Sequence, residues 1–333
     1  MKLITPKYFS NFKCKGGSCT DNCCIGWEIN IDEQTREKYR GVTGELGERM
    51  KQNIDDGGGS HFKLLGERCP FLNRENLCDI IIGFGEGYLC DICREHPRYY
   101  TILGDIAFSG VGLSCEAAAE LILSENGTHE YTECERQDIE LEECDDELLM
   151  IILRYKQTIV DILCDNALDF SKKLEMICRK TESAQCEIDG VSRLDFCKSE
   201  DVIESIEALY STLEYLDPLF LPKVISPFSQ KDKKPFLNEK YLKNLMLYFI
   251  DRYVPKAAED GDLIGKMTVA YLSAGVVGSL LPECAMLDEA IEISKEYSKE
   301  IEYNEENISK IEDAAWSGIW QGAVSYLIDL TKK

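Results

Sequence analysis

Cysteine is the residue type that gives this sequence its clearest chemical potential. The chain has 16 cysteines among 333 residues, and nine of them lie within the first 115. These nine are Cys14, Cys19, Cys23, Cys24, Cys69, Cys78, Cys90, Cys93 and Cys115. Clustered thiols typically bind a metal in a reducing compartment, whereas in a secreted protein they indicate disulfides. Because the N-terminus lacks the apolar run of a secretory signal, we expect metal binding and a cytoplasmic protein.

The tightest spacing is Cys14-x4-Cys19-x3-Cys23-Cys24-x2-Trp27, which places four thiols within eleven residues. Thiolates that share one ion lie about 2.3 Å from it, so they typically come from short, adaptable loops. Eight or nine thiols exceed one tetrahedral site. Either one cluster takes ligands from both cysteine-rich segments, or two centres lie side by side. All-thiolate ligation suits zinc and iron–sulfur clusters about equally, and the spacing leaves this choice open.

The element Cys90-x2-Cys93 is compatible with a zinc ribbon or with a redox dithiol. We favour metal binding, because the surrounding sequence lacks the strand–helix context of a thioredoxin-like fold. The nearby segment 80–87 is glycine-rich and weakly resembles a nucleotide-cradling turn. No strand–helix alternation follows it, so we interpret it as a connection between metal ligands.

Charged and aromatic side chains follow Cys93 directly. Arg94 and Arg98 could contact the carboxylate of a methionine moiety, since guanidinium is the natural bidentate partner of that group. The alternative is that they pair with local acids. Tyr99 and Tyr100 are candidate bases, with aromatic packing as the favoured interpretation, and His96 is a weaker candidate ligand.

The order of these cysteine elements resembles the flagellin lysine N-methylase family, the FliB type. The elements that carry the resemblance are Phe12-x-Cys14-x4-Cys19-x3-Cys23-Cys24-x2-Trp27, Cys69-Pro70-Phe71-Leu72, Leu77-Cys78, Cys93-Arg94-x2-Pro97-Arg98 and Ser114-Cys115. The cysteine pattern is also similar to that of the broader cysteine-cluster proteins, which are described as zinc- or iron-binding. A later segment, Tyr241-Leu242-x-Asn244-x3-Tyr248-Phe249, looks like a helical segment of the family.

The resemblance implies transfer of a methyl group from S-adenosylmethionine to lysine side chains of flagellin. It also implies an iron–sulfur centre, a 4Fe-4S cluster with zinc as the alternative, held by the N-terminal cysteines. The ligands implied in this chain are Cys14, Cys19, Cys23, Cys24, Cys69, Cys78, Cys93 and Cys115. The resemblance assigns no role to Cys90.

The charge of the chain restricts its partners. It has 37 Lys plus Arg against 61 Asp plus Glu, a net charge of -24. Residues 1–115 carry 16 acids and 14 bases, a net of -2, which leaves -22 for the rest of the chain. We therefore expect no nucleic-acid partner, because phosphate binding needs concentrated Lys and Arg. We also expect no membrane span, since the longest uncharged stretch, 267–282, is too short.

Periodicity in the sequence predicts a mainly α protein with two parts. Residues 1–116 are expected to form an irregular, Cys-rich metal-binding module, with a short helix that begins after Asp32. Residues 117–333 are expected to form an acidic multi-helix domain. The acidic run 130–147 is interpreted as a solvated helix face or a linker. The seven cysteines outside the first 115 residues are expected to be ordinary core or surface residues: Cys134, Cys144, Cys164, Cys178, Cys186, Cys197 and Cys284.

Two functions remain in competition at this point. One is the lysine methyltransferase that the resemblance implies. The other is a non-enzymatic zinc- or iron-binding protein whose acidic helical domain docks a basic partner. The oligomeric state and the identity of the catalytic base do not follow from the sequence.

Overall fold

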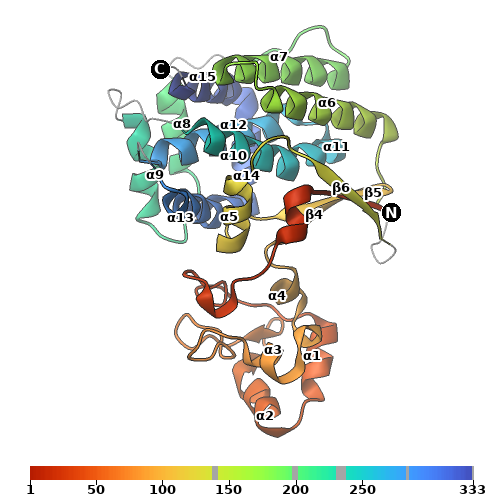
Figure 1. Ribbon diagram of the computed structural model, residues 1–333, viewed down its shortest axis with the longest axis vertical. Coiled ribbons are helices and arrows are strands. Elements are labelled where there is room, and N and C mark those ends of the chain that lie inside the picture. The colour runs from red at the N-terminus through yellow and green to blue at the C-terminus, as the bar shows by residue number, and fades with distance from the viewer. Residues whose placement is uncertain (137–141, 197–201, 230–237, 283–284, 332–333) are drawn as a thin grey trace. The chain divides into compact units, whose positions relative to one another are not determined.

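The computed structural model describes residues 1–136, 142–196, 202–229, 238–282 and 285–331. These residues form two compact units. The larger unit contains Met1–Asn11, Tyr100–Ser114 and Ala118–Lys333, and the smaller unit contains Phe12–Tyr99 and Cys115–Ala117. Both units are drawn in Figure 1. The protein is mainly helical with some sheet, which confirms the predicted fold class at that level.

The larger unit is built mostly from helices, and amphipathic periodicity predicted most of them. They are α5 (Glu116–Ser124, which begins in the smaller unit), α6 (Asp146–Cys164), α7 (Phe170–Asp189), α8 (Val202–Ser211), α9 (Phe220–Ser229), α10 (Glu239–Tyr253), α11 (Ala257–Asp260), α12 (Leu263–Leu280), α13 (Leu287–Tyr297), α14 (Glu305–Ala314) and α15 (Ile319–Thr331). A π-helical turn, Ser298–Glu302, follows α13.

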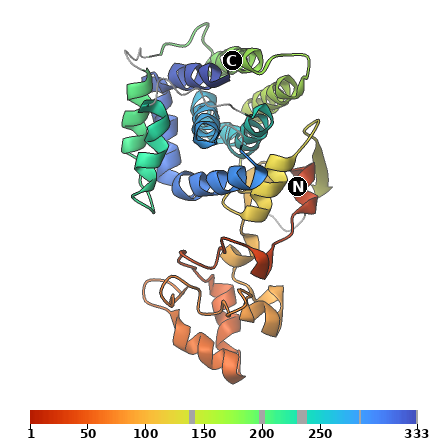
Figure 2. The same cartoon turned by 60° about the vertical axis from the view of Figure 1, so that its left-hand side comes forward.

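Helix α12 is the centre of the larger unit. It contacts α7, α10, α14 and α15, and these helices surround it in Figure 1 and Figure 2. The helix is long and apolar enough to cross a membrane, but 89% of it is buried inside the protein. A helix that is apolar on all sides is typical of the core of a large helical domain. Its one charged residue, Lys266, pairs with Asp260 and Glu312 at 2.7 Å each.

A four-stranded sheet lies in the larger unit, in the order β4-β5-β1-β6. Its strands are β1 (Lys2–Pro6), β4 (Arg98–Leu103), β5 (Ile106–Val111) and β6 (Tyr131–Glu135). Strand β1 pairs in parallel with β5 and antiparallel with β6. Residues 1–11 and 100–114, at the two ends of the expected 1–116 module, therefore belong to the larger unit. The observed division of the chain differs from the predicted single boundary at residue 116.

The sheet also corrects the interpretation of the acidic run 130–147. Residues Tyr131–Glu135 form strand β6 instead of a helix face, with Thr5 and Thr132 hydroxyls 2.8 Å apart across the pair. Alternate residues of a strand point to opposite faces, so several acids can stay in solvent while one edge pairs. Residues 137–141 lie outside the described part of the chain.

The smaller unit consists of short elements joined by irregular chain. They are α1 (Glu33–Arg40), α2 (Gly44–Asn53), β2 (Ile54–Asp55), β3 (His61–Phe62), α3 (Asp79–Phe84) and α4 (Asp91–Glu95). The predicted start of the first helix is confirmed, because the Asp32 carboxylate accepts a hydrogen bond from the Thr35 amide at 2.8 Å. Helix α3 is followed by Gly85, whose φ of 80° favours glycine. The glycine-rich segment 80–87 is therefore the end of this helix and the turn after it.

A buried ionic network ties the sheet of the larger unit to its helices. The His129 imidazole lies 2.9 Å from Glu125 and 2.7 Å from Asp251 of α10. The second oxygen of Asp251 accepts from the Tyr131 hydroxyl at 2.6 Å and lies 2.6 Å from the Lys156 ammonium. Burial disfavours the charged imidazole, but the two carboxylates outweigh that cost and raise the pKa of His129 to about 10. Lys156 and His129 likewise hold the pKa of buried Asp251 below its usual range.

We predict that His129→Ala lowers the free energy of unfolding by about 3 kcal/mol, because the Glu125 and Asp251 carboxylates lose the cation that they share. The contribution of His129 is present in full below its ordinary pKa of 6.5 and is lost as pH rises through about 10. Urea unfolding at several pH values should therefore show the gap between wild type and variant shrinking in alkali.

The exposed ion pair Lys7–Glu130 is a matched control in the same unit. Lys7→Ala should leave the free energy of unfolding close to the wild-type value at any pH, because exposed ion pairs contribute little. Equal losses for the two variants would contradict the account of the buried network.

Candidate functional site

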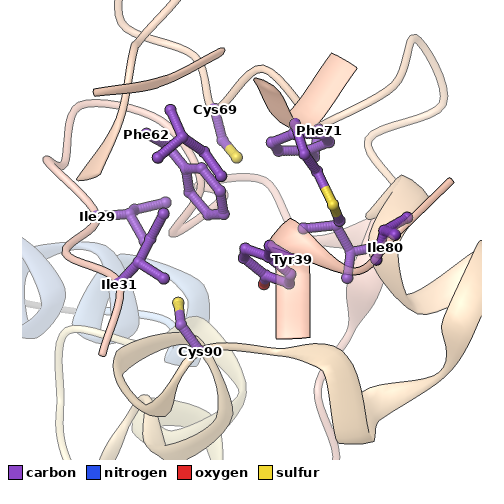
Figure 3. Packing of buried hydrophobic residues seen from close by; sticks show 11 residues of the cluster. Ile29, Ile31, Tyr39, Phe62, Cys69, Phe71, Ile80 and Cys90 are labelled. Atoms are coloured by element: carbon purple, nitrogen blue, oxygen red, sulfur yellow. The ribbon is translucent and has the colours of Figure 1, made fainter. Parts of the chain in front are cut away.

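Five cysteines of the smaller unit pack on one hydrophobic core. Cys69 and Cys90 belong to that core, at 6% and 0% exposure, and Cys24, Cys78 and Cys93 pack against it. We call these five the five-cysteine cluster. In Figure 3 the side chains of Cys69 and Cys90 enter the core from opposite sides of Phe62 and Tyr39. The Cys24 and Cys93 thiols both lie within electrostatic reach of Cys69. Four predicted ligands and Cys90 are therefore neighbours in the fold.

Short local structures carry the members of this cluster. The Cys69 amide donates to the Cys24 carbonyl at 2.8 Å, which joins the first cysteine segment to the second. Cys78 pairs with Leu72 in an isolated bridge and precedes α3, and Cys90 precedes α4. A core made of short elements gives each thiol a different backbone anchor, which sequence spacing alone did not show.

Two pairs of thiols within this region are close electrostatic neighbours: Cys23 with Cys24, and Cys90 with Cys93. The neighbouring Cys23 thiol and burial raise the pKa of Cys24, and the neighbouring Cys90 thiol and burial raise that of Cys93. Burial also raises the pKa of Cys69 to about 11. A metal that binds here must displace these protons.

Two of the remaining predicted ligands, Cys19 and Cys115, lie beside Glu116, the residue after Cys115. One carboxylate oxygen lies 2.7 Å from the Lys15 ammonium. The other accepts from the Thr20 amide at 2.8 Å, the Thr20 hydroxyl at 2.6 Å and the Cys19 thiol at 3.5 Å. Glu116 therefore fastens the loop that carries Cys19 to the segment that carries Cys115. Cys14 lies on the same loop, and its sulfur accepts from Gly16 at 3.4 Å.

The contacts of Glu116, which we call the Glu116 clamp, also determine the pKa of its carboxyl group. Burial disfavours the Glu116 carboxylate, but Lys15 and Thr20 outweigh burial and hold the pKa of Glu116 at about 2. Burial raises the pKa of Cys19 to about 11. The sequence contains no motif for this arrangement, although an acid directly after a cysteine element is a signal that could have suggested it.

The donor set fits a thiolate-bound metal in kind, because soft sulfurs are the ligands of zinc and iron–sulfur clusters. Within the described residues, however, no three Cys, His, Asp or Glu side chains converge closely enough to hold one metal ion. The expected metal-binding character of the module is thus not shown by the geometry.

The structure places the other predicted site residues near the cysteines but in local contacts. Arg94 pairs with Asp91 and, at 3.2 Å, with Glu95, which is the local pairing that the sequence left open. The Arg98 guanidinium lies over the Phe12 ring, 5.3 Å from its centroid, and donates to the Arg94 carbonyl at 3.2 Å.

The described cysteines outside the first 115 residues belong to the larger unit. Cys134 is exposed on β6, and the thiols of Cys144, Cys164, Cys178 and Cys186 are half-buried in the larger unit. Cys197 and Cys284 lie outside the described residues. The sequence analysis also missed the His129 network, because its members are far apart in the sequence. They lie between α5 and β6, in β6, in α6 and in α10.

Comparisons with known proteins give three partial relatives. The chain is 27% identical over 136 residues to the flagellar biosynthetic protein FliU of Salmonella muenchen, which covers 38% of this chain and 80% of that protein. It is equally similar, over the same share of this chain, to the lysine-N-methylases of Salmonella choleraesuis and Salmonella typhimurium. The match spans only 34% of each lysine-N-methylase. No family model matches the chain, and no solved structure matches it.

We predict that Glu116→Ala exposes Cys19 in protein freed of metal by chelation. Losing one charge-assisted hydrogen-bonded clamp, worth about 1.5 kcal/mol, should raise the rate of Cys19 alkylation by iodoacetamide about tenfold. Mass spectrometry of the alkylated peptides measures the rate at each cysteine.

Two comparisons make this test specific. Cys14, which is already exposed on the same loop, should keep its rate, and Glu28→Ala on the surface of the smaller unit should change neither. An unchanged Cys19 rate in Glu116→Ala would show that the carboxylate does not hold the loop.

Proposed function

We propose that this protein is an S-adenosylmethionine-dependent protein-lysine N-methyltransferase that acts on flagellin in the cytoplasm. The observation that carries the proposal is the partial similarity to proteins named lysine-N-methylase and FliU. The five-cysteine cluster supports it, because four cysteine elements on which the family resemblance rests meet in one core.

Methyl transfer sets clear demands on the site. The lone pair of a lysine ε-amine attacks the sulfonium methyl carbon, the carbon–sulfur bond breaks, and S-adenosylhomocysteine leaves with the electron pair. The amine must first lose its proton, so a base or a desolvating environment is required together with in-line positioning. Tyr99 and Tyr100, which both lie in strand β4, remain the candidate bases.

We further propose that the N-terminal cysteines hold an iron–sulfur centre, with zinc as the alternative. Cys24, Cys69, Cys78 and Cys93 pack on one core, which supports their role as ligands, and Cys90 is a fifth thiol of that core. A bound cluster would supply a fixed charge and a covalent crosslink between the short elements of this unit. Cys14, Cys19, Cys23 and Cys115 complete the proposed set.

The second candidate, a non-enzymatic metal-binding protein, rests on the acidity of the chain after residue 115. Its net charge of -22 would favour a basic partner at low salt. The two candidates make different demands: the enzyme must label flagellin, whereas the binding protein needs only the metal and the partner.

We predict that metal-loaded protein transfers the labelled methyl of S-adenosylmethionine to flagellin lysines. Cys93→Ser should lower this transfer by about 100-fold or more. Removing a metal ligand reduces activity more than changing the contacts that support the ligand. Scintillation counting and peptide mass spectrometry measure the label and its position.

Cys134→Ser is the matched control, since Cys134 is an exposed cysteine on β6 of the larger unit. It should transfer methyl groups at the wild-type rate, and thermal unfolding should show that both variants are folded. Absence of transfer by wild-type protein with its full metal content would reject the enzyme and favour the second candidate.

A further inference from the structure

Cys90 has no role in the proposed function, yet it is the most deeply buried thiol of the five-cysteine cluster. Its exposure is 0%, and its side chain points into the core beside Tyr39 and Ile31 in Figure 3. A buried cysteine without a partner is typically a small apolar residue. Here the sulfur instead has the Cys93 thiol as a close electrostatic neighbour within one turn of the chain.

The backbone holds these two cysteines in one turn. Cys90 is the residue before α4, its carbonyl accepts from the Arg94 amide at 2.9 Å, and Cys93 is the third residue of that helix. Residues three apart in a helical turn are neighbours, and their Cα separation falls in the range that disulfides span. The two sulfurs can therefore join by rotation of their side chains, with the turn in place.

We propose that Cys90 and Cys93 form a reversible disulfide with glutathione disulfide as the oxidant. The half-buried Cys93 thiol loses its proton as its sulfur attacks one sulfur of glutathione disulfide, which forms a mixed disulfide and releases one glutathione. Cys90 then attacks the Cys93 sulfur from the core side and releases the second. The two protein thiols lose two electrons and two protons, and one glutathione disulfide becomes two glutathione molecules.

The neighbouring pair Cys23–Cys24 does not share this geometry. A disulfide between adjacent residues closes a small ring that forces the intervening peptide bond away from its planar trans form. Of these two thiol pairs, Cys90–Cys93 is the one that can close with its peptide bonds undistorted. Oxidation at Cys90–Cys93 removes both sulfurs from the five-cysteine cluster, so the disulfide and a metal that uses Cys93 exclude each other.

The test titrates the full chain, freed of metal by chelation, with mixtures of reduced and oxidised glutathione. After alkylation of free thiols, a protease that cleaves before aspartate places Cys90 on fragment 79–90 and Cys93 on fragment 91–104, each as the only cysteine. Mass spectrometry should find these two fragments linked in oxidised protein and separate after reduction. Fragment 21–31, which holds Cys23 and Cys24, should show no loss of two hydrogens.

The variant Cys90→Ser tests the role of Cys90 directly. Without the resolving thiol, glutathione should remain on Cys93, and the mixed disulfide should accumulate about tenfold or more over wild type. Linkage of Cys93 to Cys69 or Cys24, closure at Cys23–Cys24 instead, or no linkage at any glutathione ratio would each overturn the proposal. None of these outcomes depends on methyl transfer, so the proposed function is tested separately.

Discussion

The burial of sulfur in a small core is the constraint on which the smaller unit depends. Its regular elements are short, and its core holds cysteines beside Phe62, Phe71 and Tyr39. Units of this size bury a modest fraction of their surface, so they commonly rely on a metal or on crosslinks for stability. The same thiols that could bind a metal are therefore part of the packing, and chemistry and folding are coupled in this unit.

The larger unit is stabilised in a different way. Its core surrounds the buried helix α12, and several of its buried charged groups pair in networks such as that of His129 and Asp251. The backbone also connects the two units in sequence: Cys115 and Glu116 follow strand β5 of the larger unit and belong to the smaller one. Glu116 fastens the loop of Cys19 within the smaller unit.

Sequence reasoning predicted the parts of the fold that depend on local pattern. The Asp32 cap and the helices from Asp146 onward follow from capping residues and apolar periodicity. It did not predict the sheet, because β1 pairs with strands about 100 and 130 residues away and strand pairing over such distances has no local signal. Likewise, spacing grouped the cysteines by segment, whereas the fold groups Cys24 with Cys69 and leaves Cys19 with Glu116.

The measurement that tests the central claim most directly is metal and sulfide analysis of the protein purified without oxygen, with its visible absorption spectrum. We predict a brown protein that contains iron and labile sulfide in equal amounts, both lost when Cys69 and Cys78 are replaced by serine. Stoichiometric zinc in a colourless protein would contradict the iron–sulfur assignment. A protein that binds neither metal after anaerobic reconstitution would contradict the proposed metal centre itself.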